Sequence, residues 1–188
     1  MKQDTIAAIA TGMTNSGIGI VRISGEEAFS IIDKIYKSQG NKILSREKSH
    51  TIHYGHIYDG DEMVDEVMVS VMKEPRTYTG EDTVEINCHG GIIVLKKVLN
   101  LIFKNGARPA DAGEFTKRAF LNGRIDLSQA EAVIDVINAK NEYALSNSVS
   151  QLKGGISTKI KEIRDSILNE IAFIEAALDD ANVYRFAD

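Results

Sequence analysis

The segment DTVEINCHGGIIVLKKVLNLIFKNG (residues 82–106) indicates the fold class more directly than any other. Residues Asp82–Cys88 predict a strand, because β-branched side chains alternate with polar ones. Gly90-Gly91 then leads into a helix that ends at Asn105-Gly106. The apolar face of that helix carries Leu95, Val98, Leu99 and Ile102. A strand followed directly by an amphipathic helix is typical of a sheet with helices on one face.

The rest of residues 1–119 continues this α+β pattern. Ser24-Gly-Glu-Glu27 has the form of a capping box and predicts a helix to about Lys37. The apolar face of that helix would carry Phe29, Ile32 and Tyr36. Asp59-Gly60-Asp61 is typical of a hairpin turn. Four further strands are predicted, over residues 5–10, 18–24, 51–58 and 64–73, so we expect a mixed sheet with helices.

Residues 120–188 are predicted to form part of an all-α bundle. Twelve of the 15 glycines and both prolines precede residue 119, so turn residues become rare beyond it. Asp111-x-x-Glu114 predicts a short helix to Asn122-Gly123, and Asp126-x-x-Gln129 predicts a long helix to about Ser150. A last helix carries an apolar stripe at Ile156, Ile160, Ile163, Ile167, Ile171, Ile174 and Leu178. That stripe needs further helices or a second copy of the chain to cover it, and we expect a dimer.

The composition excludes several classes of protein. The chain has 188 residues, of which 43% are apolar and 26% charged, and this is typical of a globular protein of one or two domains. No apolar run is long enough to span a membrane and no signal peptide is recognisable, so we expect a cytoplasmic protein. Cys88 is the one cysteine and has no internal disulfide partner. With a net charge of −5, a nucleic-acid partner would need a local basic patch or a second protein.

Three glycine- or histidine-containing patterns give weak signals. The stretch 12–19 imitates the spacing of a P-loop but lacks its Gly-Lys-Ser/Thr ending, so it predicts either a plain loop or a loop whose backbone amides approach a ligand. Cys88-His-Gly-Gly91 fits either a tight strand-to-helix turn or an anion site at a helix N-terminus. His50, His53 and His56 do not predict a metal site, because residues three apart in a strand face opposite sides.

Three charged residues are notable for their setting. Arg22 and Glu85 each lie inside an otherwise apolar strand, and Arg124 follows the stop at Asn122-Gly123. Charges of this kind are commonly solvated or paired across a strand. The alternative is a pocket in which a carboxylate and two guanidinium groups bind a polar ligand.

Several longer motifs carry a resemblance to a known family. They are Thr79-Gly-Glu-Asp-Thr-Val-Glu85, His89-Gly-Gly91 and Arg118-Ala-Phe-Leu-Asn-Gly-Arg-Ile-Asp-Leu-Ser-Gln-Ala-Glu-Ala132. Val21–Gly25 and Ala107–Phe115 extend the match. With these motifs the chain resembles the MnmE (TrmE) family of bacterial tRNA-modification GTPases, from Thr5 to about Leu178.

The resemblance implies a fold, a ligand and partners. Residues 1–119 would be a folate-binding and dimerisation domain related to the glycine-cleavage T-protein, and 120–188 the first part of a helical domain. The family's ligands for 5-formyltetrahydrofolate or 5,10-methylenetetrahydrofolate fall on Arg22, Glu85 and Arg124, the last of which is often Lys in the family. The implied partners are a second copy of the chain, MnmG and, through their complex, tRNA. The implied reaction is 5-(carboxymethyl)aminomethyl modification of the wobble uridine, U34.

The ligand chemistry is consistent with that assignment. A pterin presents a ring N–H and an amino group side by side, and a carboxylate such as Glu85 can accept from both. Arg22 and Arg124 supply donors for the carbonyl and carboxylate oxygens of folate.

The sequence departs from the complete family in three motifs. It contains no Gly-x-x-x-x-Gly-Lys-Ser/Thr, no Asn-Lys-x-Asp and no C-terminal Cys-x-Gly-Lys. GTP, Mg²⁺ and K⁺ would therefore belong to a G domain that this chain lacks, and we expect no GTP hydrolysis and no tRNA modification by the chain alone. Residues 179–188 also differ from the run expected there.

Two other functions remain open from the sequence. A free-standing folate-dependent aminomethyltransferase would need its own acid near the folate, and Glu81 or Asp82 are the candidates. A dimerisation scaffold would bind no ligand. We predict no catalytic and no metal-binding residue for the leading function.

Overall fold

The computed structural model describes residues 4–184 and divides the chain into two compact units, Met1–Arg124 and Ile125–Asp188. The first unit is a mixed sheet with helices and the second is helical, so the predicted fold class is confirmed. The sequence places the division at 119/120, whereas the units divide after Arg124. Arg124 therefore belongs to the same unit as Arg22 and Glu85.

The first unit is built on a seven-stranded sheet in the order β3-β4-β5-β6-β2-β1-β7. Neighbouring strands are antiparallel, except that β1 and β7 are parallel. The predicted hairpin is the β4–β5 pair. The strands are β1 (Ile6–Ile9), β2 (Ser16–Ser24), β3 (Tyr36–Lys37), β4 (Thr51–Asp59), β5 (Glu62–Met72), β6 (Thr83–Gly90) and β7 (Arg108–Pro109).

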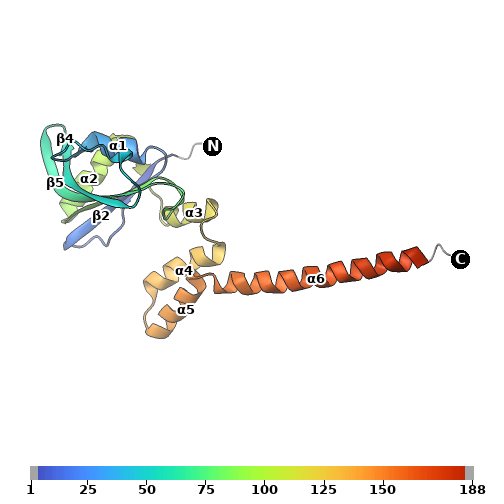
Figure 1. Ribbon diagram of the computed structural model, residues 1–188. Helices are drawn as coiled ribbons and strands as arrows, with labels where there is room; N and C mark the ends of the chain where they lie inside the picture. The colour runs from blue at the N-terminus through green and yellow to red at the C-terminus, as the bar shows by residue number, and fades with distance from the viewer. Residues whose placement is uncertain (1–3, 185–188) are drawn as a thin grey trace. The chain divides into compact units, whose positions relative to one another are not determined.

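Helices α1 (Ala28–Ile35) and α2 (Ile92–Lys104) cover one face of this sheet (Figure 1). Alternate strand residues point toward the helices, so the core forms between these layers. The other face of β2, β4, β5 and β6 is partly exposed. A 3₁₀ turn, η1 (Leu44–Arg46), and helix α3 (Glu114–Leu121) complete the unit. Core side chains include Val21, Ile23, Ile31, Ile32, Val69, Val84, Ile86, Leu95 and Ile102.

The predicted helix from Ser24 to Lys37 is wrong at both ends. The Ser24 hydroxyl donates to the carboxylate of Glu81 in place of capping α1, and α1 has no side-chain cap. At the other end Tyr36 and Lys37 form β3, which pairs with β4. Both differences arise because tertiary partners outweigh the local signal.

The second unit contains α4 (Leu127–Asn138), α5 (Glu142–Leu152) and α6 (Gly155–Tyr184). The predicted capping box of α4 is confirmed, since Asp126 accepts from the Gln129 amide and the Gln129 side chain accepts from the Asp126 amide. The single long helix predicted to Ser150 is wrong. It is interrupted before α5, whose first turn is capped by the Asn141 side chain accepting from the Ala144 amide at 2.8 Å.

Helix α6 exposes most of the predicted apolar stripe. Ile160, Ile163 and Leu178 are each 60% exposed. The side chain of Ile156 lies outside the described residues, as does the part of the 179–188 run beyond Tyr184. Within residues 4–184, no helix is both long and apolar enough to cross a membrane.

Candidate functional site

Arg22 and Glu85 form the centre of the candidate site. They are register partners on β2 and β6, and both side chains lie on the sheet face away from α1 and α2. Arg22 Nε donates a hydrogen bond to Glu85 Oε1 at 2.7 Å, and Arg22 Nη2 forms an ion pair with the same oxygen, also at 2.7 Å. Both side chains are about one quarter exposed, at 24% and 22%. The sequence alternative of a charge pair across strands is thus realised, at a position that a ligand can reach.

Tyr78 links this pair to Arg124. The guanidinium carbon of Arg22 lies 5.2 Å from the centroid of the Tyr78 ring, and that of Arg124 lies 5.3 Å from it. Phe115 adds a second ring, 5.3 Å from the Arg22 guanidinium. The Tyr78 hydroxyl is 2.9 Å from Oγ1 of Thr116, which fixes the ring. Tyr78 therefore lies against both predicted arginines, and Glu85 is joined to them through its pairing with Arg22.

Local backbone geometry directs Arg124 to this place. Helix α3 ends in a turn in which Gly123 has a φ of +70°, a conformation that favours glycine. The Arg124 amide then donates to the Ala119 carbonyl at 2.9 Å. Asn122 donates from its side chain to the Thr79 carbonyl at 2.7 Å, and this bond holds the end of α3 against the segment that carries Tyr78.

The arrangement can bind a planar polar molecule. Within the described residues, Glu85 Oε2 has no hydrogen-bond partner, so it is available as an acceptor. A two-donor fork uses both carboxylate oxygens, and Oε1 already accepts a hydrogen bond from Arg22 Nε and forms an ion pair with Nη2. Such a fork would therefore compete with Arg22 for Oε1, and any guanidinium N–H withdrawn from this oxygen becomes available to an acceptor on the ligand.

Tyr78 and Phe115 were not predicted as site residues. Tyr78 immediately precedes the motif that starts at Thr79, and Phe115 ends the segment Ala107–Phe115, so both lie at the edge of distinctive sequence. Neither Tyr78, in a loop, nor Phe115, in the first turn of α3, gives a signal of its own, because its role depends on guanidinium groups that come from distant segments.

A second charged cluster is centred on the buried Arg118. Arg118 is 5% exposed and donates to the carboxylates of Asp4, Glu81 and Glu114. Arg108 donates to Glu114 at 2.8 and 2.5 Å. These hydrogen bonds, Arg108 first, lower the pKa of Glu114 to about 2. Hydrogen bonds from the same two arginines also lower the pKa of Asp4. This network joins the segment before β1, strand β7, helix α3 and the loop before β6.

The two acids considered for an aminomethyltransferase are both engaged. Glu81 accepts from Arg118 and from the Ser24 hydroxyl, and it is 8% exposed. Asp82 accepts from the Glu74 amide at 3.0 Å. Glu81 is therefore held in buried hydrogen bonds, whereas Asp82 Oδ2 has no hydrogen-bond partner among the described residues, so this alternative would depend on Asp82.

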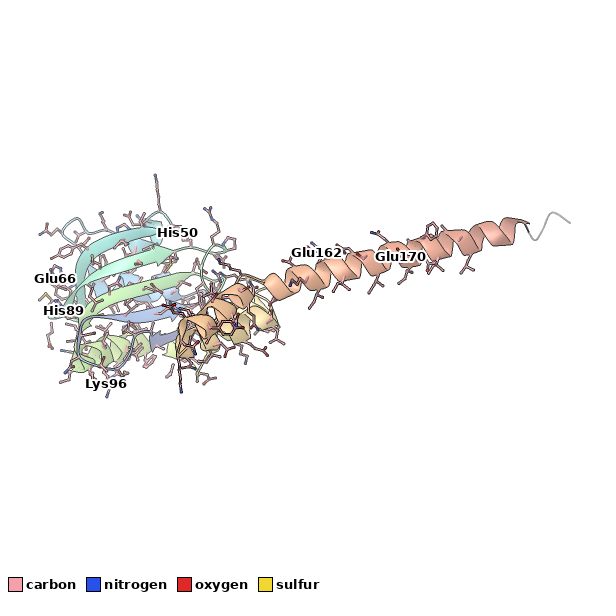
Figure 2. All side chains as sticks on the ribbon, turned by 90° about the horizontal axis from the view of Figure 1, so that it is seen from below. His50, Glu66, His89, Lys96, Glu162 and Glu170 are labelled. Atoms are coloured by element: carbon pink, nitrogen blue, oxygen red, sulfur yellow. The ribbon has the colours of Figure 1, made fainter. Side chains whose placement is uncertain are left out.

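The His89 region does not favour an anion. His89 lies on the open sheet face beside a depression of about 230 Å³, and Figure 2 shows it near Glu66. Its Nδ1 is 2.6 Å from Asp65, whose carboxylate raises the pKa of His89. Glu66 also lines the depression, so two carboxylates face one imidazole and would repel an anion. Gly90 is required by the close approach of the Ser16 backbone, which supports the tight-turn alternative.

Metal ligands are not grouped anywhere in residues 4–184: the described histidines, cysteine and acids provide no cluster of three that could hold an ion. Cys88 is a buried free thiol, and burial raises its pKa to about 12.

Comparison with known proteins gives consistent matches along the chain. Residues 5–124 match the family model described as GTP-binding protein TrmE N-terminus, and residues 127–184 match the MnmE helical domain. The chain is 64% identical over 181 residues to the tRNA modification GTPase MnmE of Lachnoclostridium phytofermentans. The matched region covers 96% of this chain and 40% of that protein. It is 56% identical over 178 residues to MnmE of Bacillus subtilis, covering 94% of this chain and 39% of that one. The chain thus spans about two fifths of the length of these relatives.

Proposed function

Because the chain belongs to the MnmE family, and carries its N-terminal and helical domains, we propose that it binds a tetrahydrofolate one-carbon donor through Glu85, Arg22 and Arg124. The observation that carries this proposal is that Arg22, which pairs with Glu85, and Arg124 both lie against the Tyr78 ring within one compact unit. The ligand is 5-formyltetrahydrofolate or 5,10-methylenetetrahydrofolate.

Each group of the site matches one part of such a ligand. The Glu85 carboxylate accepts the ring N–H and amino group of the pterin. Arg22 and Arg124 donate to the carbonyl and carboxylate oxygens of the ligand, and the rings of Tyr78 and Phe115 provide apolar contact for its flat rings. When bound, the tetrahydrofolate supplies a one-carbon unit, and this chain binds and orients it.

The wider function follows from family membership. The chain acts as a dimer in a cytoplasmic complex with MnmG that modifies U34 of tRNA, and GTP with its Mg²⁺ and K⁺ is bound by a G domain outside this sequence. The exposed stripe of α6 supports further association, because apolar surfaces of this length are rarely left in water.

Isothermal titration calorimetry with 5-formyltetrahydrofolate tests the binding site. Glu85→Gln keeps the size of the side chain and removes its charge. Charge-assisted hydrogen bonds contribute about 1.5–3 kcal/mol each, so affinity should fall at least about tenfold. Glu66→Gln is the matched control, since Glu66 is an exposed carboxylate on the same sheet face (Figure 2).

The fold is checked separately in both variants by circular dichroism and by the thermal midpoint. Unchanged affinity of Glu85→Gln, or an equal loss in Glu66→Gln, would refute the assignment of Glu85. No heat of binding with the unmodified chain would refute the folate function itself.

A further inference from the structure

The segment from Lys34 to Lys48 has a charge opposite to that of the whole protein. It holds five of the chain's 22 Lys and Arg residues and one of its 27 Asp and Glu residues, although the chain carries −5 overall. The five cations are Lys34, Lys37, Lys42, Arg46 and Lys48, and we name them the basic edge. All five are exposed.

The fold keeps the basic edge together. Lys34 is in the last turn of α1, and Lys37 is in β3, the strand at one end of the sheet order. The Asp33 carboxylate accepts from the Leu44 amide at 2.7 Å, which ties η1 back to α1. Lys73 donates from Nζ to the Ser45 carbonyl at 2.9 Å and fastens the same turn to the end of β5. The five cations are therefore carried on one short, internally bonded segment.

The cations of the basic edge are not neutralised. Within residues 4–184, none of the five takes part in an ion pair. Glu47, the acid within the segment, is half-buried and lies 4.0 Å from His53. Asp59 and Glu62, at the turn that joins β4 to β5, pair instead with Lys104 and Lys97 of α2. Lys37 lies over the Tyr58 ring, 4.4 Å from its centroid, which leaves its charge in place. A group of exposed cations without carboxylate partners attracts anionic partners.

The composition of the basic edge favours a phosphate backbone over a protein partner. Four of the five cations are Lys, a residue that is depleted in protein–protein interfaces. Ile43 is the exposed large apolar residue of this segment, at 41%, and no aromatic anchor is exposed within it. Ser38, Gln39 and Asn41 lie among the cations, and hydroxyl and amide side chains commonly donate to phosphate oxygens.

We propose that the basic edge binds the sugar–phosphate backbone of RNA, without reading its sequence. The choice of RNA over DNA rests on the proposed function, whereas the binding of a polyphosphate backbone rests on the charge arrangement alone. Counterions released from the RNA provide the free energy, so affinity should fall with salt by a slope of about −0.7 to −0.9 for each phosphate contacted.

Fluorescence anisotropy of a labelled RNA hairpin, titrated with the full chain at several salt concentrations, tests the proposal. The double variant Lys42→Glu/Arg46→Glu should lower affinity at least about tenfold at 0.1 M salt and reduce the salt slope by about 1.5. The control Lys96→Glu/Lys140→Glu makes the same change in net charge at exposed positions elsewhere and should lower affinity much less. Figure 2 shows Lys96 on the opposite side of the first unit from His50, which follows the basic edge.

Three outcomes would overturn the proposal: no binding of the hairpin by the unmodified chain at low salt, an equal loss in the control variant, or displacement of RNA by polyglutamate at equal charge concentration. The last would indicate an acidic protein partner. Titration of the same variants with 5-formyltetrahydrofolate keeps the two functions apart, because neither double variant alters the folate site. RNA binding that persists without folate binding would refute the folate function and leave the basic edge as an RNA-binding surface.

Discussion

Arg22 and Glu85 face each other across β2 and β6, and the Arg22 guanidinium contacts a single carboxylate oxygen, with a hydrogen bond from Nε and an ion pair from Nη2. This geometry orients the carboxylate and leaves Oε2 open. The Glu85 carboxylate is thus already oriented as a hydrogen-bond acceptor, and its charge is compensated by Arg22 in the unliganded chain. A ligand with two adjacent donors would compete with Arg22 for Oε1 and would find Oε2 open.

The first prediction concerns the strength of this pair. A double-mutant cycle of Arg22→Ala, Glu85→Ala and the double variant measures the coupling free energy of the pair. We expect about 0.5–1 kcal/mol, because the pair is about one quarter exposed. Urea unfolding at low salt measures it, and 1 M NaCl should reduce it. A coupling within error of zero at low salt would contradict the pairing described above.

The second prediction concerns Tyr78. Tyr78→Leu removes the ring that contacts both guanidinium groups, so affinity for 5-formyltetrahydrofolate should fall about fivefold or more. Tyr78→Phe keeps the ring and loses the contact with Thr116, so it should retain most of the affinity. Tyr143→Leu, at a residue 79% exposed on α5, is the matched control. Equal affinities in the Leu and Phe variants would show that the ring does not position the arginines.

The sequence predicts best where the signal is local. The Asp126 capping box is correct because both hydrogen bonds join residues three apart, whereas the same pattern at Ser24 fails because Glu81, far along the chain, takes its hydroxyl. Tyr36 continues a helical pattern but pairs with β4. These are tertiary effects that no short window contains.

The residues of the candidate site also fall into those that the sequence could predict and those that it could not. Arg22 and Glu85 could be singled out because a charge inside an apolar strand is unusual, and the resemblance added Arg124. Tyr78 could not, since only the end of α3 brings Arg124 to its ring. The basic edge was also missed. The net charge was counted over each half of the chain, and acids elsewhere in the first half offset the positive charge of this short segment.

The third prediction is a pH dependence of stability. Hydrogen bonds from Arg108 and Arg118 lower the pKa of Glu114 from 4.5 to about 2, so the folded state prefers the ionised carboxylate. Its contribution to stability is complete above pH 4.5 and is lost as the pH falls toward 2. Glu114→Gln should flatten this part of the curve of unfolding free energy against pH. Glu62 forms an exposed pair with Lys97, so Glu62→Gln should leave the pH dependence of the unfolding free energy unchanged. Equal flattening in the Glu114 and Glu62 variants would contradict the assignment of this pH dependence to Glu114.

The fourth prediction concerns the start of α4. The Asp126 carboxylate accepts from the Gln129 amide at 2.8 Å and from the hydroxyls of Ser128 and Ser157. Asp126→Ala should therefore lower the free energy of unfolding by about 1 kcal/mol or more. Asp135→Ala, exposed within the same helix, should cost much less. Urea unfolding followed by circular dichroism compares them, and equal losses would show that the cap does not stabilise the helix.

The last prediction concerns Cys88, whose reactivity reports on the core under β6. Burial, followed by the charge of Asp65, raises the pKa of its thiol to about 12, so at pH 8 about one thiol in ten thousand is ionised. Alkylation by iodoacetamide should be at least about 100-fold slower in the folded chain than in urea, where the thiol regains an ordinary pKa near 8.5. The folded rate should still rise about tenfold per pH unit between pH 8 and 10, while the rate in urea levels off near pH 9. If the alkylation rate of the folded chain also levelled off near pH 9, the thiol would not be buried as described, and the sheet would open at β6.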